Sequence, residues 1–293
     1  MLWRGGRRSD NIEDRRGFGG GFGGGMRMGG GIGGIGLLIV IVIGLFFGVD
    51  PTTLLQQIEG GGPGITYQDD QQSAATGGAG NDEEKDFVSV VLADTEDTWT
   101  GIFHDMGRTY TDPHLVLFSG QVQSACGFAQ TAMGPFYCPG DSKVYIDLDF
   151  YDELKQRLGA PGDFAQAYVI AHEVGHHVQH LLGITDKVDR LQGSLSESQA
   201  NALSVRVELQ ADCFAGVWAY HAKERNIVES GDIAEALNAA AAVGDDRLQR
   251  QGQGYVVPDS FTHGSSAQRV RWFKAGFAKG EIGDCDTFST NQL

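Results

Sequence analysis

Histidines gather in one short stretch of the chain. The run AHEVGHHVQH, residues 171–180, holds four histidines and one glutamate. In a helix, His172 and His176 are four residues apart and share a face, so each could offer a ring nitrogen to one metal ion. Glu173 would project beside that ion and could take a proton from a water molecule. This H-E-x-x-H pattern predicts a catalytic Zn²⁺ helix, although manganese or cobalt could use the same donors. A polar helix face in contact with solvent is the simpler alternative.

The other two histidines of this run fit the metal poorly. His177 is rotated by about 100° from His176 and leaves the metal face. His180 shares the face, but three successive turns of a regular helix cannot converge on one ion, so we expect a packing or surface role. A third histidine ligand ten positions after the first is excluded, because Leu182 stands there and Gln179 replaces the glycine of that arrangement.

A third ligand should come from a later element. The segment ELQAD places Glu208 and Asp212 four residues apart on one face of a predicted helix. Glu208 would complete a His₂Glu set with a fourth position open for water, which is typical of catalytic zinc. Asp212 could accept a hydrogen bond from the far nitrogen of His172 or His176 and fix its tautomer. A solvated pair of carboxylates is the alternative.

Hydrophobic periodicity and turn residues predict the elements that would hold these side chains. Apolar spacing and caps predict helices over 95–110, 152–158, 163–182, 197–225, 232–250 and 265–280. Residues 115–120 and 143–148 are typical of strands. A few early strands followed by helices indicate a helix-rich α+β domain with a small sheet.

The first part of the chain has a different character. Residues 1–31 are rich in glycine and carry six arginines, and residues 32–49 form eighteen apolar positions without a charge. That length is near the minimum for a transmembrane helix, and the arginines before it favour a cytoplasmic N-terminus. We therefore expect a cytoplasmic tail (1–31), an uncleaved anchor in the cytoplasmic membrane (32–49), a flexible linker (50–86) and an extracytoplasmic domain (87–293). A cleaved signal peptide is the rival interpretation.

Charge and cysteine content narrow the class of protein. The net charge is −16, so a nucleic-acid-binding surface is excluded as the main function. Four cysteines, Cys126, Cys138, Cys213 and Cys285, would lie outside the cytoplasm, where disulfides persist. One possible pairing joins Cys126 to Cys138 and Cys213 to Cys285. Three pairings are open, and four free thiols are the alternative.

Beyond single residues, whole motifs resemble a known family. HEVGH (172–176) followed by ELQAD (208–212) is similar to the gluzincin zinc peptidases. More narrowly, CGFAQTAMGPFYCPGD, IAHEVGHHVQ, ELQADCFAGVWA and FTHGSSAQRVRWF resemble the bacterial membrane-anchored neutral zinc metallopeptidases of the YpfJ type. The resemblance covers roughly the whole length. It implies a zincin-like α+β domain after one N-terminal transmembrane helix, a Zn²⁺ cofactor and a polypeptide substrate.

A second resemblance concerns a motif near the C-terminus. THGSSAQR, residues 262–269, is similar to the T-H-P-x-x-x-x-R element of membrane metallopeptidases of the HtpX type, with Gly264 in place of the proline. It implies that His263 and Arg269 lie near the oxyanion or brace a carboxylate ligand. A site that builds negative charge benefits from a positioned donor, so we predict catalytic roles for both. An arginine paired with surface acids and a histidine at a helix cap are the alternative.

Two functions from different classes follow. The first is a membrane-anchored zinc endopeptidase, in which the strand 143–148 could pair with an extended peptide. The second is a non-catalytic, zinc-stabilised module for envelope interaction or assembly. The intact Glu173 favours the first, because zinc storage needs no general base.

Overall fold

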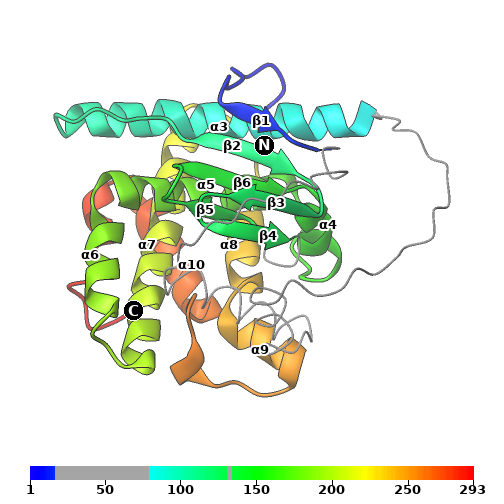
Figure 1. Ribbon diagram of the computed structural model, residues 1–293. Coiled ribbons are helices and arrows are strands. Elements are labelled where there is room, and N and C mark those ends of the chain that lie inside the picture. The colour runs from blue at the N-terminus through cyan, green and yellow to red at the C-terminus, as the bar shows by residue number, and fades with distance from the viewer. Residues whose placement is uncertain (17–78, 131–133) are drawn as a thin grey trace, which may run out of the picture.

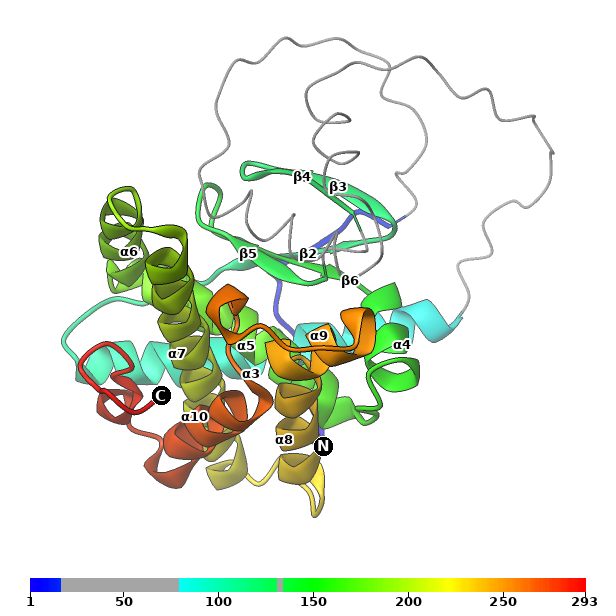
Figure 2. The same ribbon diagram turned by 90° about the horizontal axis from the view of Figure 1, so that it is seen from below.

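The computed structural model describes residues 1–16, 79–130 and 134–293. A small sheet and a β-hairpin form one side of the domain, and most of the helices pack against the other side (Figures 1 and 2). The predicted helix-rich α+β class with a small sheet is confirmed for these residues.

The main sheet has four strands in the order β1-β2-β6-β5, namely Ile12–Asp14, His114–Phe118, Lys143–Asp147 and Phe136–Cys138. β1, β2 and β6 are parallel, whereas β5 pairs antiparallel with β6. The hairpin consists of β3 (Gln121–Ser124) and β4 (Gly127–Gln130). Alternation along β2 buries Leu115 and Leu117 under the helices and Val116 and Phe118 in a second cluster with the hairpin. Both faces of the sheet are therefore covered, as expected for parallel strands.

Most helices agree with the predicted ranges, but the first helix covers 79–105 instead of 95–110, and the helix over 184–192 was not predicted. Their bounds are α3 Ala79–Asp105, α4 Asp149–Gln156, α5 Asp163–Leu181, α6 Ile184–Gln192, α7 Glu197–Glu224, α8 Asp232–Ala242, α9 Asp245–Gln253 and α10 Ser266–Lys279, with short 3₁₀ turns η2 (Pro258–Ser260) and η3 (Ile282–Cys285). The predicted helix over 232–250 is two helices. Gly244 separates them with an extended backbone (φ −72°, ψ 138°), and a Cβ at this position would collide with the backbone of Ser266.

Helix α5 lies at the centre of the domain and packs against α7, α8 and α3. Its apolar residues are buried on nearly every side. Gly175 lets α5 approach α7 closely, since a Cβ there would lie 3.0 Å from the carbonyl oxygen of Ala211. The closest part of this helix crossing therefore lies between the two predicted histidine ligands.

Two disulfides connect different elements of the fold. Cys126 is bonded to Cys138, which joins the hairpin to β5, and Cys213 is bonded to Cys285, which joins α7 to η3. Of the three pairings that the sequence left open, the structure has this one. Both bonds restrict the unfolded chain and stabilise the domain.

The first sixteen residues belong to the domain, contrary to the expectation of a separate tail. β1 adds a parallel strand to the sheet, and the Trp3 ring packs edge-on against Phe87 with centroids 5.5 Å apart. The Met1 ammonium lies 2.7 Å from Asp163 and 3.3 Å from Asp232. The domain therefore includes residues 1–16 and helix α3 from Ala79, rather than beginning at residue 87.

The N-terminal arginines have partners in this arrangement. All five arginines in residues 1–16 form ion pairs with carboxylates of α3 or of β1, namely Arg4, Arg7, Arg8, Arg15 and Arg16. Their positive charge thus has a structural use apart from membrane orientation.

Within the described ranges, no helix is long and apolar enough to cross a membrane. The predicted anchor (32–49) and most of the predicted linker (50–86) lie outside the described residues.

Candidate metal centre

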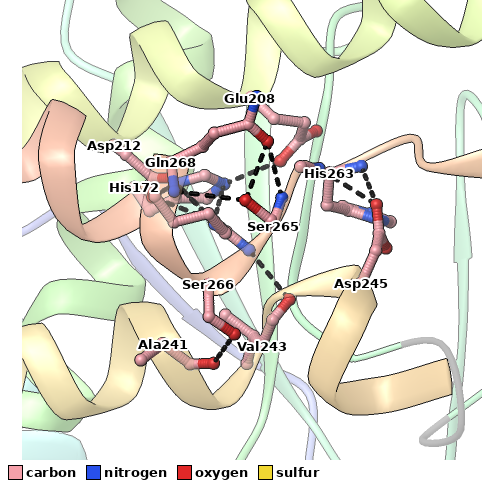
Figure 3. Close-up of polar contacts among 12 residues, drawn as sticks. His172, Glu208, Asp212, Ala241, Val243, Asp245, His263, Ser265, Ser266 and Gln268 are labelled. Atoms are coloured by element: carbon pink, nitrogen blue, oxygen red, sulfur yellow. Dashed lines mark hydrogen bonds and ion pairs between the residues drawn. The ribbon is translucent and has the colours of Figure 1, made fainter. Parts of the chain in front are cut away.

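Three predicted ligands come together between helices α5 and α7. Nε2 of His172 lies 3.2 Å from Oε2 of Glu208, and Nε2 of His176 lies 3.5 Å from Oε1 of the same carboxylate. One donor atom from each of the three residues lies within 4.8 Å of the others. The helical period brings the two histidines onto one face, and the α5–α7 crossing brings the glutamate opposite them (Figure 3 shows His172 and Glu208).

The electrostatics of this group favour a cation at its centre. Burial lowers the pKa of His172, but Asp212 and Glu208 outweigh that effect and raise it to about 10. Burial raises the pKa of Glu208, yet His176, His263 and His172 hold it well below its ordinary value. Two buried carboxylates thus require positive charge nearby.

The donor set fits a zinc ion. Two imidazole nitrogens and one carboxylate form the His₂Glu combination of catalytic zinc sites. Both Nε2 atoms face the carboxylate, while both Nδ1 atoms face other acceptors, so the tautomers are those that a metal ligand needs. A divalent cation would replace the proton that His172 holds without it.

Glu173, the predicted base, lies beside this group on the same helix and is 7% exposed. Burial raises the pKa of Glu173, against the lowering effect of His172 and His176. A carboxylate with a raised pKa is a stronger proton acceptor, which suits a general base.

Behind His172, a buried network fixes the ring. Nδ1 of His172 lies 3.0 Å from Oδ1 of Asp212, so of the two histidines considered for this contact the structure selects His172. Arg269 donates to both carboxylate oxygens of Asp212, and the hydroxyl of Tyr168 donates to Oδ1. Asp212 is fully buried. Burial raises the pKa of Asp212, but the opposite effect of Arg269 and His172 is larger, so the pKa lies below its ordinary value.

Arg269, for which a catalytic role is predicted, belongs to this network. The guanidinium is 3% exposed, binds the Asp212 carboxylate and lies 3.3 Å from Nδ1 of His172. The resemblance to the HtpX type had implied a place near the oxyanion or against the carboxylate ligand, whereas the carboxylate that Arg269 contacts is Asp212, behind a ligand. Tyr168 had not been recognised from the sequence, although it stands four residues before His172 on the same helical face.

His263 is held in place by a residue that sequence reasoning missed. Asp245, at the start of α9, accepts hydrogen bonds from the backbone amides of Thr262, His263 and Gly264 and contacts Nδ1 of His263 at 3.2 Å (Figure 3). Gly264 has a φ of +91°, which proline cannot adopt, so the departure from the T-H-P pattern follows from the loop conformation.

The charge of His263 depends on its neighbours. Burial lowers the pKa of His263, but Asp245 and then Glu208 raise it above its ordinary value. The ring is part-exposed near the metal group, and therefore it could present a protonated Nε2 to a developing negative charge.

The remaining histidines of the run lie away from the ligand group. His177 is buried, with Nδ1 3.0 Å from the Tyr137 hydroxyl and Nε2 2.7 Å from the Thr111 carbonyl oxygen. Burial lowers its pKa to about 4. The ring of His180 lies against Tyr137 with centroids 6.2 Å apart. Both therefore pack against the β5 side of α5.

Comparisons with known proteins show the family of the chain. The model of the family described as "Putative neutral zinc metallopeptidase" matches residues 1–288. The chain is 55% identical to the "Uncharacterized protein YpfJ" of Escherichia coli (strain K12) over 291 residues, which cover 98% of this chain and 99% of that protein.

The chain belongs to this zinc metallopeptidase family. A further relative is the "Uncharacterized protein Rv2575" of Mycobacterium tuberculosis (strain ATCC 25618 / H37Rv), at 45% identity over 218 residues, 71% of this chain and 73% of that protein. No solved structure matches the chain. The family name suggests a hydrolase that uses zinc on a polypeptide, in line with the resemblance noted from the motifs.

Proposed function

We propose that this protein is a zinc endopeptidase that hydrolyses peptide bonds with Glu173 as the general base. The observation that carries the proposal is the group of His172, His176 and Glu208, whose donor atoms lie within 4.8 Å of one another beside a buried glutamate. A zinc ion held by these three side chains would supply a Lewis acid that lowers the pKa of a water molecule.

The protein's own groups then divide the remaining work. Glu173 accepts a proton from the attacking water and delivers it to the leaving amine, for which its raised pKa is suited. His263, oriented by Asp245, donates a hydrogen bond to the oxyanion of the tetrahedral intermediate. Asp212, Arg269 and Tyr168 hold the His172 ring and touch no substrate.

An extended substrate would pair with β5 rather than with the strand that the sequence suggested. β6 lies between β2 and β5, and its backbone is hydrogen-bonded on both sides. β5 is the last strand of the described sheet, and the contact of Tyr137 with His177 places it beside α5. Added as a further strand, a peptide would therefore lie along the zinc helix.

The location of the domain forms part of the proposal. Two disulfides favour a compartment outside the cytoplasm. The apolar residues 32–49 would associate with the cytoplasmic membrane. Residues 1–16 then lie on the same side as the zinc domain, because they are packed into it.

The test compares the wild-type protein with Glu173→Gln, loaded with zinc and incubated with a mixed peptide library. New peptide termini, mapped by mass spectrometry, should arise with the wild type and fall to background with the variant, while zinc content stays equal. Glu197→Gln, at the exposed start of α7, is the matched control and should cleave normally. Equal cleavage by Glu173→Gln would rule out the base. Zinc binding without any cleavage by the wild type would favour the non-catalytic interaction module.

A further inference from the structure

The second histidine of the metal group has a different partner from the first. Nδ1 of His176 lies 2.9 Å from Oε1 of Gln179, three residues further along α5. An amide oxygen can only accept, so Nδ1 carries the hydrogen and the lone pair of Nε2 faces Glu208. Gln179 thus has the position toward His176 that Asp212 has toward His172.

The orientation of the Gln179 amide is itself fixed. Its Nε2 donates to the carbonyl oxygen of Val207 at 2.7 Å and to Oε1 of Gln210 at 3.1 Å. If the Gln179 amide were reversed, its Oε1 would face two acceptors, the Val207 carbonyl and Oε1 of Gln210, and its Nε2 would face the N–H of His176. All three hydrogen bonds would then be lost. Gln179 has no exposed surface, and thus solvent cannot replace these partners.

The chain of contacts continues to the C-terminal segment. Nε2 of Gln210 donates to the carbonyl oxygen of Cys285 at 2.9 Å, and Cys285 is bonded to Cys213, one turn after Gln210 on α7. Gln210 is 6% exposed and Cys285 is 1% exposed. A buried path of four groups therefore runs from the ligand nitrogen to a carbonyl that a disulfide holds in place.

We propose that Gln179 is a positioning residue that fixes the tautomer and ring orientation of His176, and that Gln210 and the disulfide-bonded Cys285 hold Gln179 in turn. This inference rests on the proposed function, because it takes His176 as a metal ligand. The alternative is that Gln179 has a structural role alone, in which its amide serves as a hydrogen-bond partner for buried groups between α5 and α7. The two roles differ in metal affinity, since partners behind a ligand typically change it by about 10–100-fold.

The experiment measures zinc affinity by chelator competition and the visible spectrum of the Co²⁺-substituted full-length protein. Gln179→Met removes the acceptor at similar size, and it should weaken zinc binding by about 10–100-fold and change the Co²⁺ spectrum. Gln179→Glu keeps an acceptor but loses both donors, so it should bind zinc more tightly than Gln179→Met and less tightly than the wild type, while its metal-free form melts earlier. Gln210→Met, one contact further away, should weaken zinc binding less and in the same direction.

Gln192→Met is the matched control, because the Gln192 amide bonds Ser204 on α7 without touching the ligand group. It should leave zinc affinity and spectrum unchanged. Unchanged affinity and spectrum in both Gln179→Met and Gln210→Met would overturn the positioning role, even if both variants are less stable. Failure of the wild type to bind zinc through His176 would overturn the proposed function as well, so the two failures are distinguishable.

Discussion

Arg269 binds Asp212 through two hydrogen bonds, from Nε to Oδ2 at 2.7 Å and from Nη2 to Oδ1 at 2.9 Å, although 57 residues separate them. Both side chains are almost completely buried. Such a pair is stable only when both members are present, because a single charge left in the interior lacks both water and a partner. The pair therefore links the C-terminal helix α10 to the ring of His172 through one carboxylate.

Removal of this guanidinium should destabilise the fold. Arg269→Met leaves Asp212 buried without its main counter-charge, and we expect the free energy of unfolding to fall by about 3–5 kcal/mol. Chemical denaturation followed by circular dichroism measures it. Arg271→Met, two residues further on and exposed, is the control and should change little. A loss below about 1 kcal/mol for Arg269→Met would contradict the assigned burial cost.

The zinc-free protein should lose stability at alkaline pH. Its fold raises the pKa of His172 from 6.5 to about 10, so the stabilisation is fully present below pH 6.5 and is lost as the pH rises through about 10. The melting temperature of the metal-free protein should therefore fall as the pH rises through this range. Zinc-loaded protein is the control, because the ion replaces the proton and should flatten this part of the curve. Parallel curves for the two forms would argue against a charged His172 in the metal-free site.

The pair of His263 and Asp245 should affect turnover more than substrate binding. His263→Ala removes the proposed donor to the oxyanion, and kcat should fall by about 10²–10³-fold with a smaller change in KM. Asp245→Asn should lower kcat as well, because the ring of His263 loses its acceptor. The measurement uses a peptide cleaved by the wild type. Zinc content is determined in each variant, and an unchanged kcat in His263→Ala would exclude the donor role.

The packing of the N-terminal segment on α3 can be tested in cells. A Cβ at Gly6 would lie 2.7 Å from Cγ1 of Val90, so cysteines at positions 6 and 90 are within reach of a disulfide. We expect this pair to form in intact cells, as detected by mass spectrometry of the linked peptides. Cysteines at positions 6 and 102 are the control, because position 102 is about 18 Å further along the same helix. Labelling of positions 6 and 90 from opposite sides of the membrane would show that the segment is not packed on the domain.

The amino-acid sequence by itself determined the local part of the site. A helical period of 3.6 residues places His172 and His176 on one face of their helix, independently of the rest of the fold. It likewise places Glu208 and Asp212 on one face of a second helix. Strong periodicity likewise predicted α5, α7 and α10 to within a residue or two. Strand β5 and helix α6 are short, and their patterns were too weak to predict.

Only the tertiary structure decided which groups stand behind the ligands. The contacts of Asp212 with Arg269, of Gln179 with Gln210 and of Asp245 with His263 join residues 57, 31 and 18 positions apart. Local periodicity carries no information on such pairs, because they depend on how helices cross. The same reason applies to the N-terminal arginines: their composition resembles a membrane signal, but the carboxylates that α3 brings beside them give them a place in the fold.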